Sequence, residues 1–358
     1  MMKNLLTLIV VALLASATTA EDRVWTDATG GHTVEAEFSG LNDGKVILKR
    51  VDGQTFAMPL EGFSRADQEY VRKEVERRRA ALKVEVSDKP GTVLYGPGKQ
   101  LCALANSMID ESSGLACSRS RPGLFWTHND SGDLARLYAL DRQGKDLGWC
   151  DLKDVQAFDF EDVASFSRDG KHYLLVGDTG NNGLAATIQI LYLIEEPPID
   201  ADKGVSLAET PIVQVINYSY EDDHRNCEAL AIDPSDRTIL LVTKERESKC
   251  LVYALVWPKN DPKQATSAKK IATLKIPLVT AMDVSPDGRR AVVLTYGNAY
   301  EYTRGEKETW ATAFSRRPAL IRVPERVQGE SICYGPDGKT LYLTSEKLPT
   351  PLIEVPVK

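Results

Sequence analysis

Short apolar runs, separated by polar turns, repeat along most of the chain. In GESICYGPDGKTLYLTSEK (residues 329–347), two β-prone runs flank Pro-Asp-Gly-Lys, which is a turn signal. Each repeat is a short strand, a turn rich in Pro, Asp, Gly or Ser, and a second strand that ends in a polar loop. Similar stretches cover residues 112–133, 160–182, 226–247 and 280–298. This pattern predicts a chain made mainly of antiparallel β-hairpins.

The first strand of each repeat opens on a polar residue, which we call its lead residue. In chain order the lead residues are Ser113, Glu161, Glu228, Thr280 and Glu330. Their separations of 48, 67, 52 and 50 residues fit one four-stranded unit per repeat, with an insertion in the second. The period predicts an all-β fold, a β-propeller of five blades, or of six if the long second repeat hides another.

Further β-prone runs supply the remaining strands of the repeats. Third strands are expected at 136–140, 188–194 and 250–257, and fourth strands at 211–220 and 269–278. The last repeat has a third strand at 351–357 and no fourth. We expect residues 99–108, which precede the first repeat, to provide it, because closing the ring with both ends of the chain removes an open sheet edge.

Residues 23–74 follow a different pattern. Alternating strands are expected at 33–39, 44–51 and 54–59, and Ser64 is expected to cap a charged helix, with Asp67 three residues on, that runs to about residue 84. The motifs W-T-D-x-T-G-x-x-x-V-E-A-E-F and P-L-x-x-F-S-x-A-D-Q-x-Y-V resemble the Sla-one homology domain, a small SH3-like barrel. The resemblance implies recognition of a protein or peptide. Trp25 and Phe38 are interpreted as barrel core, with a ligand groove as the alternative.

The expected organisation is a signal peptide at 1–20, the SH3-like domain at 21–84, a linker at 85–98 and the propeller at 99–358. The first twenty residues combine Lys3, an apolar run from Leu5 to Leu14 and small residues up to Ala20, which is typical of a Sec-type signal. The run is too short for a mature membrane anchor, and no later segment is long and apolar enough. We expect export to the periplasm or the outside of the cell.

Charge and cysteine content restrict the classes of partner. The net charge of −7 argues against nucleic acid and is compatible with cations. No CxxC motif occurs, so a zinc ribbon or a thioredoxin-type site is not expected. Disulfides of undetermined pairing and free core thiols are both open interpretations for Cys102, Cys117, Cys150, Cys227, Cys250 and Cys333.

The lead residues are candidate metal ligands. The first strand of each propeller blade lines the central axis, so the carboxylates of Glu161, Glu228 and Glu330 should meet hydroxyls of Thr280 and of Ser112 or Ser113. Carboxylates this close cannot all stay ionised without a counter-ion, and Ca²⁺ suits oxygen ligands. The alternative is that these acids cap strand ends or accept backbone hydrogen bonds without a metal.

A polar rim is expected around the lead residues. In an antiparallel hairpin the end of the second strand lies beside the start of the first, so residues 16 or 17 positions after a lead residue should be its neighbours. Such a rim suits a phosphate or sugar ligand, and ordinary turn chemistry is the alternative. Its members are Asn129, Asp130, Asp178, Lys244, Glu245, Glu346 and Lys347.

The lead motifs also carry a family resemblance. The order ESSG (111–114), FEDVA (160–164), NCEALA (226–231), TAMDV (280–284) and GESIC (329–333) resembles calcium-dependent apyrase nucleotidases, which are secreted five-bladed propellers. The resemblance implies axial Ca²⁺ ligands at Ser112, Glu161, Glu228, Thr280 and Glu330, and a Ca²⁺-activated water that attacks a terminal phosphate. EALAI and GESIC also resemble esterase-like phytases, and THNDSG, FEDVA and VGDTGNN resemble uncharacterised bacterial secreted propellers.

Two functions follow from these patterns. In the first, the propeller is a Ca²⁺-binding module for a ligand or protein, joined to a protein-interaction domain. In the second, it is a Ca²⁺-dependent phosphohydrolase, for which Lys244, Arg246 and Lys347 are the candidate phosphate-binding residues. The four histidines are scattered and no GxSxG motif occurs, so nucleophilic catalysis is not favoured and no catalytic residue is assigned.

Overall fold

The chain forms two compact units, Met1–Lys83 and Val84–Lys358. The structure is a computed structural model that describes residues 23–42, 45–50, 54–81, 84–130, 132–200, 203–245, 248–258 and 265–358. The expected signal peptide at 1–20, the turn residues 43–44 and 52–53, and Arg246 lie outside the described residues. Among those described, no helix has the length and apolar character needed to cross a membrane.

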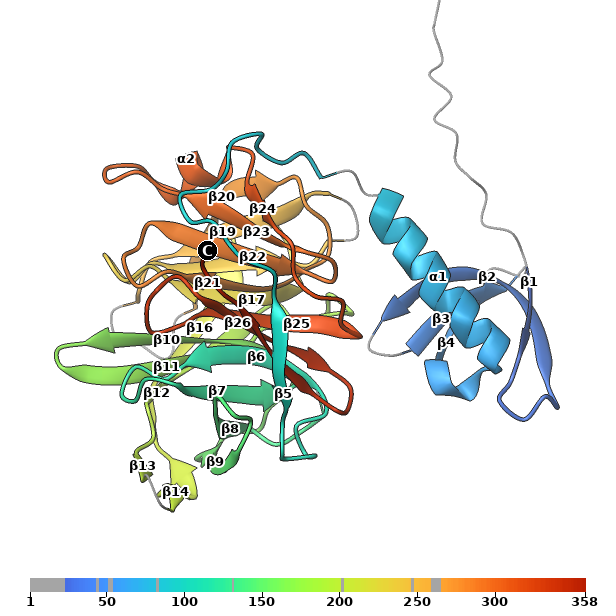
Figure 1. Ribbon diagram of the computed structural model, residues 1–358, viewed down its shortest axis with the longest axis horizontal. Helices are drawn as coiled ribbons and strands as arrows, with labels where there is room; N and C mark the ends of the chain where they lie inside the picture. Colours follow the sequence, from blue (N-terminus) through green and yellow to red (C-terminus); the bar gives the residue numbers. More distant parts are fainter. Residues whose placement is uncertain are drawn as a thin grey trace, which may run out of the picture. The chain divides into compact units, whose positions relative to one another are not determined.

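The first unit is a four-stranded antiparallel sheet with one helix (Figure 1). The strands follow chain order, and the sequence patterns predicted all but the first of them. Trp25 and Phe38 are both 1% exposed, with ring centroids 6.0 Å apart, so both belong to the core. The elements are β1 (Arg23–Thr26), β2 (Thr33–Asn42), β3 (Lys45–Arg50), β4 (Thr55–Pro59), a 3-10 turn (Leu60–Gly62) and α1 (Arg65–Ala81).

Ser64 caps the start of the helix, as the sequence predicted. The Asp67 amide donates to Ser64 Oγ at 3.3 Å, and the Ser64 hydroxyl donates to the Asp67 carboxylate at 2.7 Å. Asp67 also accepts the Thr26 amide at 2.9 Å and pairs with Arg23. This buried carboxylate therefore ties the helix start to the first strand.

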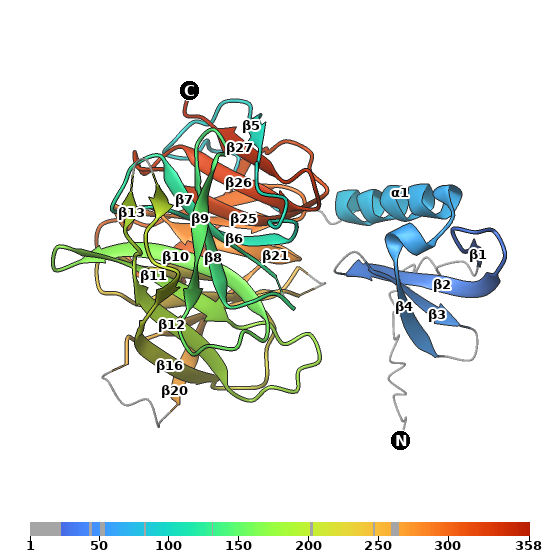
Figure 2. The ribbon, with the colours of Figure 1, turned by 90° about the horizontal axis from the view of Figure 1, so that it is seen from below.

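The second unit is a propeller, with five four-stranded blades among the described residues (Figures 1 and 2). Blade 1 consists of β6 (Ser112–Cys117), β7 (Leu124–Asn129), β8 (Arg136–Asp141) and β9 (Asp146–Leu152). Blade 2 consists of β10 (Phe160–Arg168), β11 (Lys171–Asp178), β12 (Gln189–Glu195) and β16 (Ile212–Tyr220). Blade 3 consists of β17 (Cys227–Ile232), β18 (Ile239–Thr243), β19 (Cys250–Leu255) and β20 (Thr266–Leu274). Blade 4 consists of β21 (Val279–Val284), β22 (Arg290–Thr295), β23 (Ala299–Thr303) and β24 (Ala319–Ile321). Blade 5 consists of β25 (Gln328–Tyr334), β26 (Leu341–Glu346), β27 (Pro351–Val355) and β5 (Lys99–Ala103).

Both ends of the propeller sequence meet in blade 5. Strand β5 pairs antiparallel with β27, with Cys102 opposite Leu352. The prediction that residues 99–108 complete the last blade is confirmed. This closure matters because it fixes β25, and hence Glu330, beside the first blade.

The long second repeat holds an insertion rather than a sixth blade. Its extra residues form the short hairpin β13 (Ile199–Asp200) and β14 (Gly204–Val205), and then β15 (Glu209–Thr210). Strand β15 pairs in parallel with β9 and becomes an additional edge strand of blade 1. The insertion therefore covers an outer edge and leaves the axis unchanged.

The segment 85–98, expected as a linker, packs on the propeller. The Ser87 amide donates to the Pro318 carbonyl at 2.8 Å, and the Tyr95 hydroxyl donates to Glu301 at 2.6 Å. These bonds place the segment within the second unit, which begins at Val84.

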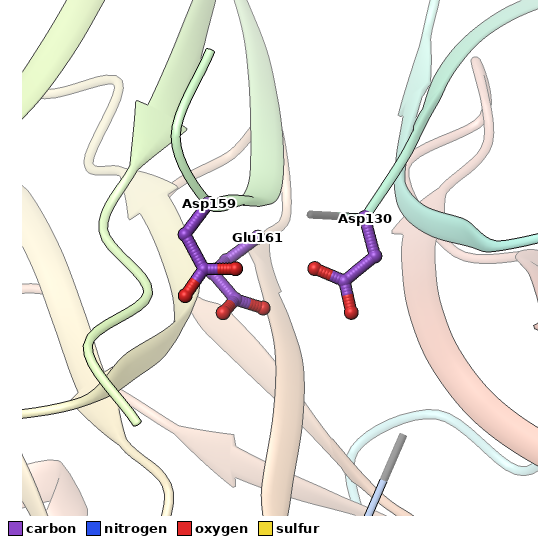
Figure 3. Close-up of side chains that lie close together, drawn as sticks. All are labelled: Asp130, Asp159 and Glu161. Atoms are coloured by element: carbon purple, nitrogen blue, oxygen red, sulfur yellow. The ribbon is translucent and has the colours of Figure 1, made fainter. Parts of the chain in front are cut away.

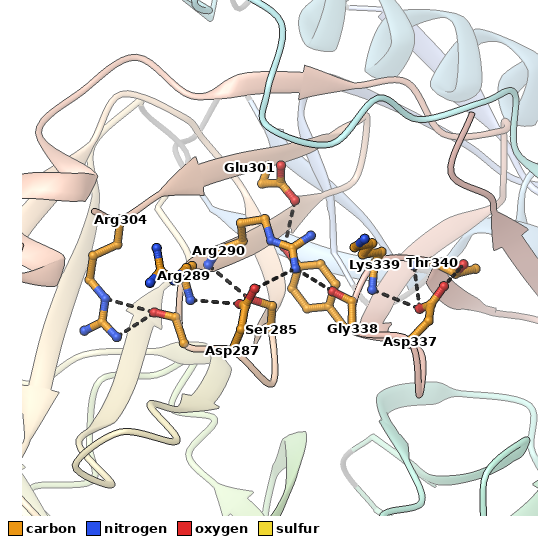
Figure 4. A network of polar contacts seen from close by, with 12 residues as sticks. Ser285, Asp287, Arg289, Arg290, Glu301, Arg304, Asp337, Gly338, Lys339 and Thr340 are labelled. Atoms are coloured by element: carbon orange, nitrogen blue, oxygen red, sulfur yellow. Dashed lines mark hydrogen bonds and ion pairs between the residues drawn. The ribbon is translucent and has the colours of Figure 1, made fainter. Parts of the chain in front are cut away.

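Equivalent Pro-Asp-Gly turns join the first and second strands of blades 4 and 5 (Figure 4). Asp287 accepts the Arg289 amide at 3.0 Å, and Asp337 accepts the Lys339 amide at 2.9 Å. Arg290 then donates to the Gly338 carbonyl at 2.7 Å, which links the two turns. The turn signal of the repeat therefore also holds neighbouring blades together.

Buried apolar clusters lie between consecutive blades, five in the described part of the propeller. The six cysteines are free thiols, and all except the half-buried Cys102 are buried. Burial raises the pKa of the Cys117 thiol to about 12. Free core thiols, one of the two interpretations left open by the sequence, are what the structure contains.

Candidate functional site

Each first strand carries a β-bulge where its lead residue stands. The strand register shifts across these residues, and a bulge of this kind turns a side chain away from its ordinary direction. The shifts fall between Ser112 and Gly114, Phe160 and Asp162, Cys227 and Ala229, Val279 and Ala281, and Gln328 and Ser331. The lead position of blade 1 is therefore Ser113, with Ser112 just before the bulge.

The hydroxyls predicted as metal ligands make protein contacts. Ser113 Oγ donates to the Glu161 carbonyl at 2.9 Å, and Thr280 Oγ1 donates to the Gly329 carbonyl at 2.8 Å. Each of these bonds joins a lead residue to the next blade. Ser112 Oγ lies 2.7 Å from Thr127 Oγ1 and 2.6 Å from Thr344 Oγ1, so it belongs to a separate buried hydroxyl group.

Glu228 has its charge compensated within the protein. Its carboxylate accepts Lys244 Nζ at 2.6 Å and Asn226 Nδ2 at 2.7 Å. Lys244 also stands 5.0 Å from the centre of the Tyr296 ring. Burial lowers the pKa of Lys244, but the charge of Glu228 outweighs burial and holds that pKa well above its usual range. Lys244 lies 16 residues after Glu228, the spacing that the hairpin predicts for a neighbour.

Glu161 faces two further carboxylates (Figure 3). Oxygen atoms of Asp130, Asp159 and Glu161 lie within 4.8 Å of one another. Asp130 follows β7, Asp159 precedes β10 and Glu161 is the lead residue of β10, so blades 1 and 2 both contribute. Glu161 is 3% exposed. Burial, and then the charges of Glu228 and Asp130, raise the pKa of Glu161 well above its usual range.

Gly180 keeps the space beside these carboxylates open. A Cβ atom at this position would lie 2.1 Å from Asp159 Oδ2 and 2.3 Å from Glu161 Oε1. The backbone of Gly180 is held in place because its amide donates to the Asp159 carbonyl at 3.1 Å. Any larger residue would therefore displace one of the two carboxylates.

Two more buried acids complete what we call the axial acidic cluster: Asp130, Asp159, Glu161, Glu228, Glu330 and Glu346. Glu330 Oε1 accepts Gln328 Nε2 at 2.9 Å, whereas Glu330 Oε2 is buried without a hydrogen-bond partner in the described structure. Burial raises the pKa of Glu330 to about 7. Burial and the neighbouring charges of Glu330 and Asp130 raise the pKa of Glu346 to about 9.

The remaining predicted rim residues mostly hold loops. Asn129 accepts the Glu111 amide at 3.3 Å, and Asp178 accepts the amides of Asp159 at 2.8 Å and Phe158 at 3.3 Å. Glu245 accepts the Thr243 hydroxyl at 3.2 Å. Lys347 Nζ lies 3.1 Å from Glu111 and 3.5 Å from Glu346. Asp178 bears on the site indirectly, because it fixes the backbone that presents Asp159.

Asp159 was not predicted, although the sequence contains its signal. The residue two positions before a lead glutamate is Asn226 in blade 3 and Gln328 in blade 5, and each amide donates a hydrogen bond to that glutamate. In blade 2 the same position is Asp159, whose side chain has no N–H donor. Aligning the lead motifs two residues further upstream would have shown this exception.

Comparison with known proteins identifies the first unit. A family model described as SLA1 homology domain 1 matches residues 15–79. The first unit is an SLA1 homology domain 1 (SHD1). Two curated relatives align with SHD1: actin cytoskeleton-regulatory complex protein SLA1 of Mycosarcoma maydis, 44% identical over 45 residues, and the sla1 protein of Sclerotinia sclerotiorum, 42% identical over 52 residues. The alignments cover 13% and 14% of this chain and 4% of each relative.

Solved structures similar to the chain have low sequence identity to it. A gluconolactonase from Xanthomonas campestris aligns with a TM-score of 0.39 and 12% identity, over 94% of this chain and 87% of that one. A luciferin-regenerating enzyme aligns with a TM-score of 0.42 and 11% identity, over 74% and 97%. The RRP9 WD40 repeats align with a TM-score of 0.38 and 9% identity, over 94% and 93%.

Proposed function

We propose that the propeller is a Ca²⁺-dependent binding module, joined through SHD1 to a second protein. The observation that carries this proposal is that Asp159 lies beside Glu161. The equivalent glutamates of blades 3 and 5 have a side-chain amide donor at that position instead. Glu161 is buried and Asp159 is half-buried, and two carboxylates this close are stabilised by a cation or a proton between them. Export of this module stays a prediction, which is supported by the signal-like sequence of residues 1–20.

The geometry of the three carboxylates fits a hard cation. Oxygens bound to one Ca²⁺ ion at 2.3–2.6 Å lie at most about 5 Å apart. The oxygens of Asp130, Asp159 and Glu161 satisfy this condition. A ligand set of carboxylates, without His or Cys, favours Ca²⁺ over Zn²⁺. Because Asp130 comes from blade 1 and Glu161 from blade 2, a cation held here would also join two blades.

The phosphohydrolase alternative has less support. It requires cationic side chains that can hold a phosphate beside the metal. Lys244 forms an ion pair with Glu228, with Nζ 2.6 Å from Oε2, and Lys347 lies between Glu111 and Glu346. Arg246, the third candidate, lies outside the described residues. The arrangement therefore favours a binding role for the axial acidic cluster.

Metal titration during thermal unfolding tests the proposal. The protein is stripped with EDTA and melted with increasing Ca²⁺ or Mg²⁺. Ca²⁺ at about 100 times its Kd is expected to add roughly 2.7 kcal/mol and to raise Tm by about 5 °C or more. Glu161→Gln should abolish the shift, and the exposed control Asp169→Asn should retain it.

Two other outcomes would change the conclusion. A Tm that ignores both metals, or an equal Ca²⁺ shift in Glu161→Gln, would eliminate the cation site. Ca²⁺-dependent phosphate release from a panel of nucleotides and phosphate esters, absent in Glu161→Gln, would replace the binding role with the hydrolase.

A further inference from the structure

Exposed apolar side chains gather in the loops at one end of the propeller. They lie in the loops β5–β6, β7–β8, β9–β10, β11–β12, β24–β25 and β26–β27. Their exposed fractions run from 42% for Ile188 to 71% for Val327. We call them the apolar crescent: Met108, Leu134, Phe158, Leu184, Ile188, Val327 and Leu348.

The strand register shows that these loops share the end of the ring where the first strands begin. Ser112, at the start of β6, pairs with Asn129 at the end of β7, and Phe160 of β10 pairs with Asp178 at the end of β11. Neighbouring loops also touch. Asn129 Nδ2 donates to the Met108 carbonyl at 2.7 Å, and the Lys347 amide donates to the Asp110 carbonyl at 2.7 Å.

The apolar crescent covers one continuous arc of that end. In ring order it runs from the junction of blades 4 and 5, through blades 5 and 1, to blade 2. The loop before blade 3 is different, because its exposed residues are Glu221, Asp222, Asp223 and His224. Leu184 reaches its exposed place with φ of 51°, a backbone conformation that is unfavourable for leucine. Monomeric proteins seldom expose large contiguous apolar patches without a partner for them.

The arc also carries an excess of negative charge. Burial, and then the charges of Glu330, Asp130 and Glu111, raise the pKa of Glu346, so these carboxylates lie in its neighbourhood. Lys347 is their neighbour, 3.1 Å from Glu111 and 3.5 Å from Glu346. Glu330 Oε2 is left as a buried acceptor without a donor in the described structure.

We propose that the apolar crescent and the carboxylates it borders form a docking surface for a polypeptide that presents a lysine or arginine between apolar side chains. This inference rests on the proposed binding role and names the partner. The apolar side chains supply contact area, and the part-exposed carboxylates of Glu111 and Asp130 select the cationic head. The same charge repels acidic peptides, nucleic acid and anionic lipid.

Selection of short random peptides against the immobilised full chain tests this surface. Enriched peptides are expected to contain lysine or arginine flanked by apolar residues. Affinity for a selected peptide should fall about tenfold or more when norleucine replaces its basic residue, and likewise in Glu111→Gln, which neutralises a part-exposed carboxylate. Leu134→Ser with Val327→Ser should also lose binding. The matched control, Leu207→Ser with Val256→Ser, changes exposed apolar residues outside the apolar crescent and should bind normally.

Several results would overturn the inference. These are an absence of enrichment, winners without a basic residue, or equal binding by the Leu134→Ser, Val327→Ser variant. A dimer in sedimentation analysis that this variant abolishes would make a second copy the occupant instead. The Ca²⁺ melt separates the two proposals. If this variant no longer binds the peptides but Ca²⁺ still raises its Tm, the substitutions have damaged the docking surface and left the cation site intact.

Discussion

Blades 2 and 3 begin with the same β-bulge and the same glutamate, and they differ in what stands beside it. In blade 3, Glu228 accepts hydrogen bonds from Asn226 and Lys244. In blade 2, Glu161 has Asp159 at the position of Asn226, and Asp130 nearby. Glu161 and Glu228 therefore differ in two neighbours: Asp159 stands in place of Asn226, and the end of β11 has no counterpart of Lys244.

The energetic consequences of the two arrangements are opposite. A buried ion pair with additional hydrogen bonds roughly balances its own desolvation, and it becomes costly only when one partner is removed. Carboxylates that stand close together repel one another, so such a group destabilises the fold and is stabilised by a cation that binds it. Blade 3 is expected to contribute to stability without a ligand, and blade 2 only with one.

Lys244→Met should give the largest effect, because it opens the closed arrangement. Removing the ammonium leaves Glu228 buried without its cation, which typically costs about 3–5 kcal/mol. Urea unfolding, with the midpoint and slope measured together, gives the loss. The exposed pair of Lys171 and Glu195, 2.7 Å apart, is the control, and Lys171→Met should cost less than about 1 kcal/mol. A small loss in Lys244→Met would mean that Glu228 is not held by this contact.

Asp159→Asn should give Glu161 the kind of amide donor that Glu228 has in Asn226. The new amide can donate to Glu161, so the free energy of unfolding in EDTA should rise by about 1–3 kcal/mol. The Ca²⁺ affinity should fall by about tenfold or more, since one charged ligand is lost. Melts of the variant in EDTA and in Ca²⁺ measure both effects at once.

The matched reverse change is Asn226→Asp in blade 3. It removes a donor from Glu228 and adds a like charge, so stability should fall without any new Ca²⁺ response, because Lys244 still occupies Glu228. If Asp159→Asn kept the full Ca²⁺ affinity, the comparison between the two blades would not explain cation binding.

Local patterns were sufficient to predict most of the fold. A strand, a turn and a returning strand are encoded within about twenty residues, so the lead residues gave the blade period, and the missing last strand indicated how residues 99–108 close the ring. The position of β15 was not predictable, because its parallel pairing with β9 joins two residues far apart in the sequence. The first strand, β1, was also missed in a segment of only four residues.

The candidate site was partly predictable for the same reason. Hairpin register placed Lys244 beside Glu228 and Glu346 beside the start of β25. Strand register does not predict which carboxylate accepts a hydrogen bond from a neighbouring side chain, because that depends on the direction in which side chains point at a β-bulge. Asp159 stands in a loop outside the hairpin, so the periodic pattern passed over a residue that distinguishes blade 2 from blade 3.

Thr280→Val should give the smallest effect, and it tests whether a lead hydroxyl is structural or a ligand. Thr280 Oγ1 donates to the Gly329 carbonyl at 2.8 Å, and Ser113 Oγ makes the equivalent bond to the Glu161 carbonyl at 2.9 Å. Loss of one such bond typically costs about 1 kcal/mol. Unfolding in urea should show this loss in Thr280→Val and in Ser113→Ala, with the Ca²⁺ affinity of both variants unchanged. A Ca²⁺ affinity that falls about tenfold in Thr280→Val would instead make the hydroxyl a ligand, and the cation would then belong on the propeller axis among all five lead residues rather than between blades 1 and 2.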